Sequence, residues 1–206
     1  MLFLLTGDVQ IGKTRWLERL LADLQRKGVT PYGVLAPGVW VPSDAPEANA
    51  QGFEKLGIDN VLLPQNERLR FANRIDLAKR DGTYDENAQA GRMGLGWHIS
   101  DEAIEHVNAH LASIPKLFDE EKGQGLLVID ELGRLELHKG EGLVEAMRLL
   151  DEGPRPGLDN AVLIVRETLV DEAEARYAEA WDGACRIAPD GQGRARIESA
   201  LGLTNS

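Results

Sequence analysis

The feature of this 206-residue chain that most constrains its fold is a short apolar segment followed by a glycine-containing loop and an amphipathic helix. Leu2–Leu5 is a continuous apolar run, typical of a strand that is buried on both faces of a parallel sheet. Residues 7–14 read GDVQIGKT and fit the pattern G-x-x-x-x-G-K-[ST]. Over residues 13–27 apolar side chains recur at helical spacing, and Gly28 provides the stop. The order of strand, loop and helix predicts an α/β fold with a phosphate-binding loop.

Each part of this loop has a chemical role in holding a polyphosphate. The glycines let successive backbone N–H groups face one oxyanion, and the following helix adds its positive N-terminal end. Lys13 neutralises charge on the β- and γ-phosphates, and the hydroxyl of Thr14 is a ligand for Mg²⁺. A chance match in a glycine-rich loop is the alternative, but the flanking strand and helix are the context that the mechanism requires. The predicted nucleotide-binding residues are Gly7, Asp8, Val9, Gln10, Ile11, Gly12, Lys13, Thr14 and Arg15.

A second apolar run, residues 126–129, ends on two acidic residues, Asp130 and Glu131. A carboxylate at the tip of a central strand is well placed to hold Mg²⁺ opposite the Thr14 hydroxyl, and we expect this role for Asp130. Glu131 can face the γ-phosphate, where it would orient and deprotonate an attacking water. We therefore predict Lys13 and Glu131 as catalytic residues and Thr14 and Asp130 as metal ligands. The alternative is structural, because acidic residues commonly end strands and begin turns.

The rest of the chain alternates strand and helix patterns, apart from two stretches that follow neither. Residues 41–57 have no clear period, and the glycine-rich residues 76–96 are expected to form a mobile functional loop or to be disordered. Pro115 should break or bend the helix that precedes it. The alternation predicts one α/β domain over residues 1–206 with a mainly parallel sheet. We expect strands at 32–40 (broken by Pro37), 161–165 and 185–188 (an edge strand), a hairpin from 61–63 and 69–72, and helices at 100–114, 143–150, 169–180 and a short one ending near Leu201.

Charge and cysteine content narrow the class of protein further. The 23 basic and 34 acidic residues give a formal net charge of −11, which argues against nucleic acid as the main ligand but allows one small polyphosphate in a local pocket. The single Cys185 favours a reducing compartment. No apolar run approaches the roughly 20 residues of a membrane-spanning helix, and residues 1–5 have no cationic lead. We therefore expect a soluble cytoplasmic protein without a membrane partner.

A guanine-nucleotide-binding protein is a competing interpretation of the two motifs. Residues 130–133 fit D-x-x-G, and residues 73–76 (NRID) nearly fit the guanine-reading N-K-x-D. The second match fails because Arg74 replaces the lysine and because this segment precedes Asp130, whereas the guanine-reading loop of such proteins follows it. We interpret residues 73–76 as polar surface, and no set of residues in the chain specifies adenine or guanine.

With both motifs placed, the chain resembles the small P-loop nucleoside triphosphatases, the family of the thermophile and human cancer-related enzymes. Residues 128–137 (VIDELGRLEL) are similar to the family signature V-I-D-E-[IV]-G-K-M-E-L, with Arg134 where lysine is usual and Leu135 where methionine is usual. Segments 33–39, 52–53 and 96–99 match in the same order. The loop departs from the family at Gln10, where glycine is usual, and at Arg15, where a second threonine or serine is usual.

The resemblance implies a fold and an activity. The implied fold is a three-layer P-loop NTPase with a RecA-like, mainly parallel sheet and helices on both faces. An added strand lies between the strand that precedes the Lys13 loop and the strand that ends at Asp130, and a small β-hairpin is inserted. The implied activity is Mg²⁺-dependent hydrolysis of ATP, GTP and other triphosphates to diphosphate and phosphate, with Glu131 as general base.

Two arginines have alternative roles. Arg134 either pairs with Glu136 or Asp130 to hold the acidic strand tip, which is the interpretation we favour, or stabilises charge on the γ-phosphate. Arg92 lies in the glycine-rich stretch and is either a solvated residue or an arginine finger that acts when this stretch closes.

Four further side chains are placed near the expected site by their position in the chain. Arg166 and Thr168 follow the strand at 161–165 and can sense the γ-phosphate. Trp97 and His98 are expected to anchor the glycine-rich stretch to the domain rather than to touch the nucleotide.

Two other functions remain open from the sequence. A small-metabolite kinase uses the same loop but transfers the phosphoryl group to a bound acceptor. A nucleotide-dependent switch or accessory protein hydrolyses slowly and so resets a binding surface. The expected ligands are a nucleoside triphosphate and Mg²⁺ in each case, with room for an unidentified protein partner.

Overall fold

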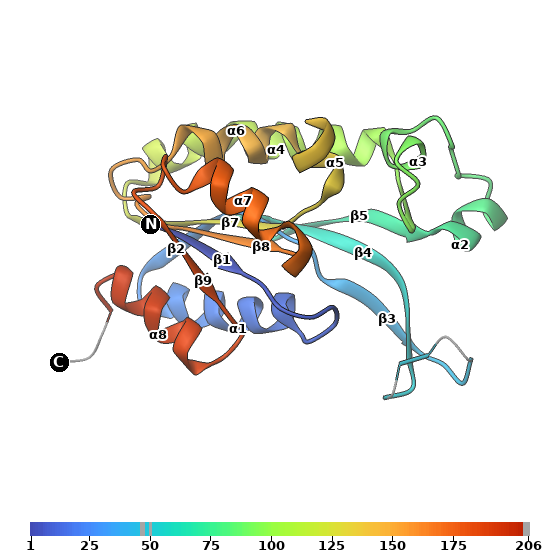
Figure 1. Cartoon of the computed structure of the whole chain (residues 1–206), viewed down its shortest axis with the longest axis horizontal. Coiled ribbons are helices and arrows are strands. Elements are labelled where there is room, and N and C mark those ends of the chain that lie inside the picture. Colours follow the sequence, from blue (N-terminus) through green and yellow to red (C-terminus); the bar gives the residue numbers. More distant parts are fainter. Residues whose placement is uncertain (46–47, 50, 204–206) are drawn as a thin grey trace.

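The computed structural model describes residues 1–45, 48–49 and 51–203, which form a sheet with helices packed against it (Figure 1). The sheet has nine strands within these residues, in the order β6-β5-β4-β2-β7-β8-β1-β9, with β3 paired to β4. The strands are β1 (Leu2–Leu5), β2 (Val29–Leu35), β3 (Gly38–Pro42), β4 (Phe53–Leu63), β5 (Glu67–Arg74), β6 (Trp97–Ile99), β7 (Gln124–Leu132), β8 (Ala161–Val165) and β9 (Ala184–Ile187). The helices are α1 (Lys13–Arg26), α2 (Ile75–Arg80), α3 (Gln89–Arg92), α4 (Asp101–Glu121), α5 (Arg134–Lys139), α6 (Val144–Glu152), α7 (Val170–Tyr177) and α8 (Gly191–Ala200), with a 3₁₀ turn η1 (Glu167–Leu169).

The strands β2, β7, β8, β1 and β9 run parallel and form one half of the sheet. Helices α4, α6 and α7 lie on one face of this half and α1 and α8 on the other, giving three layers (Figure 1). Alternate residues of β8 enter two separate cores: Leu163 packs with the α4, α6 and α7 side, and Val162 with the α1 and α8 side. The apolar runs of β1, β7 and β8 are therefore explained by burial on both faces.

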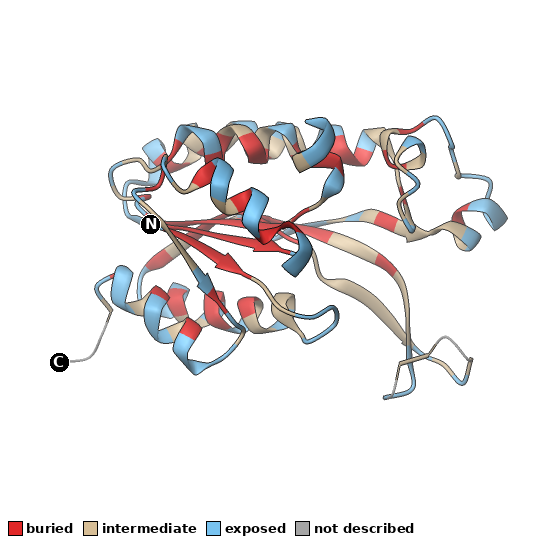
Figure 2. Cartoon of the chain, viewed as in Figure 1, coloured by how far each residue is buried: buried red, intermediate tan, exposed pale blue. Residues whose placement is uncertain are grey.

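The other half of the sheet is antiparallel and consists of β3, β4, β5 and β6, joined to the parallel half where β4 pairs with β2. Its strands are much less buried than β1 or β8, and intermediate or exposed residues predominate along β3, β5 and the first half of β4 (Figure 2). The expected small hairpin at 61–63 and 69–72 is present, but it is the centre of a larger four-stranded unit. The central sheet is thus mostly parallel, as predicted, but it is mixed because of this antiparallel half.

The antiparallel half accounts for several boundaries that the sequence predicted wrongly. The strand expected at 32–40 forms two strands, β2 and β3; the predicted break at Pro37 is present, but β2 begins earlier and β3 ends later than predicted. Residues 53–57, within the stretch that shows no clear period, are the start of β4. This part of β4 is only partly covered, so its side chains carry no continuous apolar signal. The glycine-rich residues 76–96 include most of α2 and the whole of α3.

Two helices also differ from expectation. Pro115 does not end α4, which continues to Glu121. Proline removes one backbone hydrogen bond, but Ile114 and Phe118 on either side of it are buried in the core and hold the helix against the sheet. The short helix α5, which follows the acidic tip of β7, was not predicted. The strand predicted at 161–165 is present with the predicted ends. The other predicted helices and strands, at 13–27, 126–129, 143–150, 169–180 and 185–188 and the one ending near Leu201, are present with shifted ends.

The strand order brings together the segments that carry the motifs. Strand β8 lies between β1, which precedes the Lys13 loop, and β7, which contains Asp130. The expected added strand between them is therefore present. Since parallel strands end at the same edge, the loops after β1, β7 and β8 meet there, outside the carboxyl ends of the strands. No helix in the described part of the chain is long and apolar enough to cross a membrane.

Candidate functional site

The loop between β1 and α1 has the backbone shape that its glycines predict. Gly7 and Gly12 have φ of 129° and 93°, values that L side chains rarely adopt. Gln10, the position at which the loop departs from the resembled family, has φ of 65°. A non-glycine residue in this left-handed region carries backbone strain of about 1–2 kcal/mol, which explains why glycine would be easier to accommodate there.

Lys13 folds back over this loop rather than extending into solvent. Its Nζ donates hydrogen bonds to the carbonyl oxygens of Gly7 at 2.8 Å and Asp8 at 2.9 Å. The ammonium group is thereby held within the curl of the loop, where backbone N–H groups and the α1 N-terminus add to its positive potential. Asp8, Val9, Gln10 and Ile11 are exposed along the outside of the loop.

Asp130 lies at the end of β7 and is almost completely buried, with 3% of its surface exposed. Its Oδ2 accepts a hydrogen bond from the backbone N–H of Ala36, at the end of β2, at 3.0 Å. Burial raises the pKa of the Asp130 carboxyl to about 6, and the polar surroundings provided by the Ala36 N–H and the nearby Thr14 side chain oppose this rise. The structure therefore brings the Thr14 hydroxyl and the Asp130 carboxylate together, as the two motifs predict.

Glu131, the next residue, is more accessible and faces a different partner. Its Oε1 accepts a hydrogen bond from Nε of Arg166 at 2.7 Å, and Arg166 follows β8, the strand next to β7. The 3₁₀ turn after β8 is tied back to β1, because the Thr6 hydroxyl donates to Glu167 at 3.2 Å. The ends of β1, β7 and β8 are thus linked by side-chain contacts.

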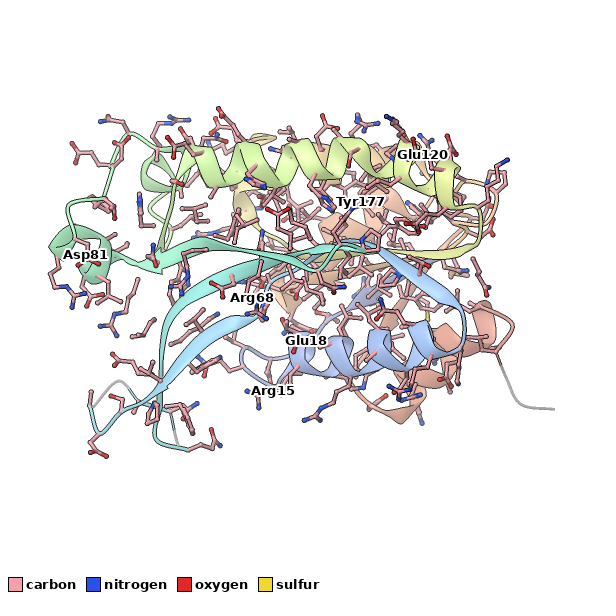
Figure 3. All side chains as sticks on the ribbon, turned by 180° about the vertical axis from the view of Figure 1, so that it is seen from behind. Arg15, Glu18, Arg68, Asp81, Glu120 and Tyr177 are labelled. Atoms are coloured by element: carbon pink, nitrogen blue, oxygen red, sulfur yellow. The ribbon has the colours of Figure 1, made fainter. Side chains whose placement is uncertain are left out.

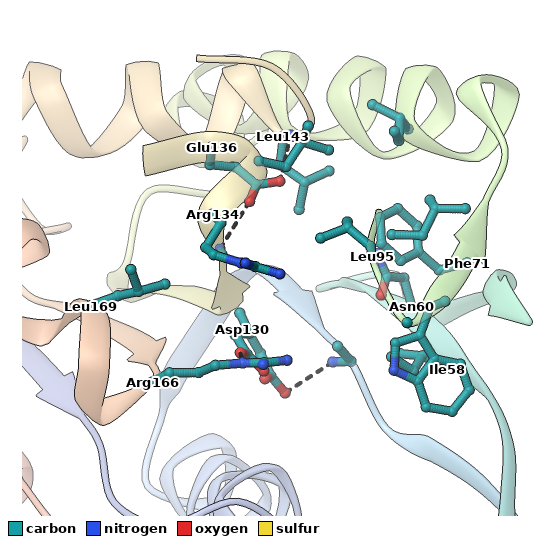
Figure 4. Close-up of a pocket in the computed structure, with 18 of the residues that line it drawn as sticks. Ile58, Asn60, Phe71, Leu95, Asp130, Arg134, Glu136, Leu143, Arg166 and Leu169 are labelled. Atoms are coloured by element: carbon teal, nitrogen blue, oxygen red, sulfur yellow. Dashed lines mark hydrogen bonds and ion pairs between the residues drawn. The ribbon is translucent and has the colours of Figure 1, made fainter. Parts of the chain in front are cut away.

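A cleft of about 280 Å³ opens beside these groups (Figure 4). Thr14, Asp130, Glu131, Arg166 and Thr168 line it, so both residues suggested after β8 are in the site. Its opposite wall comes from the antiparallel half of the sheet. A second hollow of about 620 Å³ adjoins it and is lined by Gln10 of the phosphate loop, Trp40 of β3 and Trp97 of β6.

Lys55 of β4 is a site residue that the sequence analysis missed. It lines both hollows, and its ammonium lies 5.1 Å from the centre of the Trp97 ring and 6.0 Å from that of Trp40. Burial lowers the pKa of Lys55, while the negative charges of Glu131 and Asp130 act in the opposite direction. No motif surrounds Lys55, and residues 41–57 showed no period, so nothing in the local sequence distinguishes it from a surface lysine.

The structure tests one of the two alternatives for Arg134, its pairing with a carboxylate. Arg134 forms no salt bridge with a carboxylate among the described residues, so the favoured pairing with Glu136 or Asp130 was wrong. Glu136 instead accepts hydrogen bonds from the backbone N–H groups of Gly133 at 2.9 Å and Leu143 at 3.2 Å, and Arg134 lines the cleft. The guanidinium of Arg134 extends into the cleft in Figure 4.

Four other suggested residues lie in different surroundings. Arg92 donates to the backbone oxygen of Asn87 at 2.7 Å and to Glu141 at 3.0 Å, and it does not line the cleft. Arg15 is exposed and projects from α1 away from the sheet in Figure 3, so its contact with phosphate stays a prediction. His98 is buried and packs against Tyr84, as expected of an anchor, whereas Trp97 lines both hollows.

The donors that meet at this edge are suited to a hard cation. Thr14 and Asp130 offer hydroxyl and carboxylate oxygens, and within the described residues no cluster of three or more His, Cys, Asp or Glu side chains suits a metal. Mg²⁺ prefers oxygen ligands and is usually held by only one or two protein carboxylates together with phosphate oxygens and water. The donor set therefore fits Mg²⁺ that arrives with a polyphosphate better than a resident metal centre.

Comparisons of the chain with protein-family models, with curated proteins and with solved structures gave no match.

Proposed function

We propose that the chain is a P-loop nucleoside triphosphatase that hydrolyses a nucleoside 5'-triphosphate to the diphosphate and phosphate. The observation that carries this proposal is the meeting of three features at one sheet edge: the glycine-shaped loop with Lys13, the Thr14 hydroxyl beside the buried Asp130, and the more accessible Glu131. Loop, metal-ligand pair and potential base are the parts that phosphoryl transfer to water requires.

Each group has a distinct role in this proposal. Backbone N–H groups of residues 7–14 hold the β- and γ-phosphates, and Lys13 exchanges its carbonyl partners for phosphate oxygens. Thr14 and Asp130 would hold Mg²⁺, which would supply positive charge to neutralise the phosphates. Glu131 orients an attacking water and accepts its proton. Arg166, bonded to Glu131, is close enough to take part in stabilising the transferring group, as is Arg134.

The proposal is tested by phosphate release from ATP, GTP, CTP and UTP, each with and without Mg²⁺. We expect release that depends on Mg²⁺ and needs no added acceptor. Absence of release from every triphosphate would contradict hydrolysis as the function. The same panel determines base preference, for which the chain carries no sequence signal.

The role of Glu131 is tested by the Glu131→Gln variant, with Glu120→Gln on the exposed face of α4 as the matched control (Figure 3). Removing the base should lower turnover by about 10² to 10⁴-fold while Mg²⁺–nucleotide binding persists. The control should hydrolyse at the wild-type rate. Unchanged hydrolysis by Glu131→Gln would remove Glu131 from the role of base.

A second candidate, phosphoryl transfer to a small acceptor, is favoured by one specific observation. The cleft continues past Glu131 into a region with largely apolar walls, which has room for a small molecule beside the site of the γ-phosphate. Adding a panel of small hydroxylated metabolites to the assay separates the two activities. A kinase would lose nucleotide much faster with one acceptor than with water alone.

A further inference from the structure

The cleft contains a buried amide that has no hydrogen-bond partner in the described part of the protein. Asn60 of β4 is 1% exposed, it lines the cleft, and neither its Nδ2 nor its Oδ1 makes a hydrogen bond there. Buried side-chain polar atoms are nearly always paired, because leaving one unpaired is unfavourable. An amide with both atoms unpaired is therefore suited to a ligand that supplies both partners.

The walls around Asn60 are apolar. They come from β4, β5, β6 and the residues just before it, and α4, and they include Ile58, Phe71, Leu95, Ile99 and Ile104. Figure 4 shows Asn60, Ile58, Phe71 and Leu95 on one side of the cleft, with Arg134 and Arg166 reaching in from the other. A ligand seated here would place an apolar body against one wall and its outer end near the two guanidinium groups.

The pairing requirement of Asn60 restricts the chemistry of that ligand. An amide side chain presents a donor next to an acceptor, so a full match needs an acceptor next to a donor. A hydrocarbon would leave both atoms unpaired, and a carboxylate would satisfy only the Nδ2 donor. A cyclic cis-amide, in which N–H stands beside C=O, satisfies both, and its ring suits apolar walls in a cleft of about 280 Å³.

We propose that this cleft binds a small, mostly apolar ring compound with a cis-amide edge, recognised by Asn60, next to the proposed phosphate site. This second-ligand site goes beyond the proposed hydrolysis and does not depend on it. Its own contacts come from β4, β5, the 95–99 segment and α4, whereas the phosphate loop contributes only Thr14 to the same cleft.

The experiment uses 2-pyridone, which has the cis-amide edge, and N-methyl-2-pyridone, which lacks the N–H donor. Binding is followed by NMR shifts of the Asn60 side-chain amide and of the Leu95 and Ile104 methyl groups, without nucleotide. We expect 2-pyridone to shift all three groups and to bind at least about tenfold more tightly than its N-methyl analogue. Absence of these shifts at millimolar 2-pyridone, or equal affinity of the two probes, would overturn the proposal.

Substitution of Asn60 separates a ligand-binding role from a structural one. Asn60→Leu should raise Tm, because it removes two unpaired buried atoms, and should abolish the preference for 2-pyridone. The matched control is Asn108→Leu, since Asn108 is fully engaged: it donates to the Gly142 oxygen at 2.9 Å and accepts from the Glu145 N–H at 3.0 Å. This control should lower Tm and retain the preference. A lower Tm for Asn60→Leu would show that Asn60 is already satisfied, and the proposal would fail.

Repeating the 2-pyridone titration on the Lys13→Ala variant distinguishes ligand binding in this cleft from nucleotide hydrolysis. We expect unchanged probe binding in this variant, whatever its rate of phosphate release. Loss of probe binding in Lys13→Ala would contradict a site that is separate from the phosphate loop.

Discussion

The parallel and antiparallel halves of the sheet differ in burial and in what they contribute to the site. Strands β1 and β8 are buried along their whole length, whereas β3 and β5 are mostly intermediate or exposed. The parallel half supplies the phosphate loop and both acidic residues, and the antiparallel half supplies Lys55, Asn60 and the tryptophan-lined wall. The groups to which we assign the proposed reaction thus lie on the more deeply buried half of the sheet, and the partly exposed strands form the wall facing them.

The first prediction, with the largest expected effect, concerns the phosphate loop. Lys13→Ala removes the ammonium held in the curl of the loop and should lower kcat/KM by about 10² to 10³-fold, as expected when one pre-positioned charge donor is lost. Steady-state phosphate release measures this effect. Lys116→Ala on the exposed face of α4 serves as the control and should match the wild type. Equal activity of the two variants would remove the loop from the mechanism.

The second prediction tests whether the two halves differ in stability as well as in burial. Leu163→Ala in the fully buried β8 should reduce the free energy of unfolding by about 2–5 kcal/mol, since it leaves a cavity in the core. Leu69→Ala in the half-buried β5 should reduce it by about 1 kcal/mol, because the site can relax toward solvent. Urea denaturation measures both values. Equal losses would show that the antiparallel half is as tightly packed as the parallel one.

The third prediction uses the raised pKa of Asp130. Because its pKa is about 6 in the native state and near 4 in the unfolded chain, the native state binds this proton more tightly. The free energy of unfolding therefore falls by about 3 kcal/mol as pH rises from about 4 to 6, and it stays lower by this amount at higher pH. Asp130→Asn removes the titrating carboxyl and with it this loss. In EDTA, which removes divalent cations, the variant should be more stable than the wild type above about pH 7 and equally stable below about pH 4. Chemical denaturation across pH checks this, and a destabilised variant at neutral pH would contradict it.

The fourth and smallest prediction concerns the wall that faces the groups to which we assign catalysis. Lys55→Met keeps the length of the side chain but removes its charge, and should lower kcat/KM by about tenfold, because less positive potential then attracts the polyphosphate. Rates at low and high salt measure the effect, which should shrink as salt rises. Lys139→Met at the exposed end of α5 is the control. A loss as large as that of Lys13→Ala would place Lys55 among the catalytic groups.

The structural core of the parallel half was predictable from the sequence because its signals are local. Leu2–Leu5 and Ala161–Val165 are continuous apolar runs, and burial on both faces of the sheet requires such runs. The glycine spacing of residues 7–14 reports the left-handed backbone positions of Gly7 and Gly12 directly. The antiparallel half was harder to predict, because partly exposed strands such as β3 tolerate many residue types and leave no clear alternation.

The sequence by itself therefore determined the strand-loop-helix unit, the acidic tip of β7 and the α/β class, all of which follow from neighbouring residues. Only the tertiary structure decided that the Thr14 side chain meets Asp130, that Arg134 lines the cleft instead of pairing with Glu136, and that Lys55 and Asn60 face the same space. These contacts depend on the order in which strands pair. That order is set by strand pairing and side-chain packing between segments that are far apart in the sequence, and no local pattern encodes it.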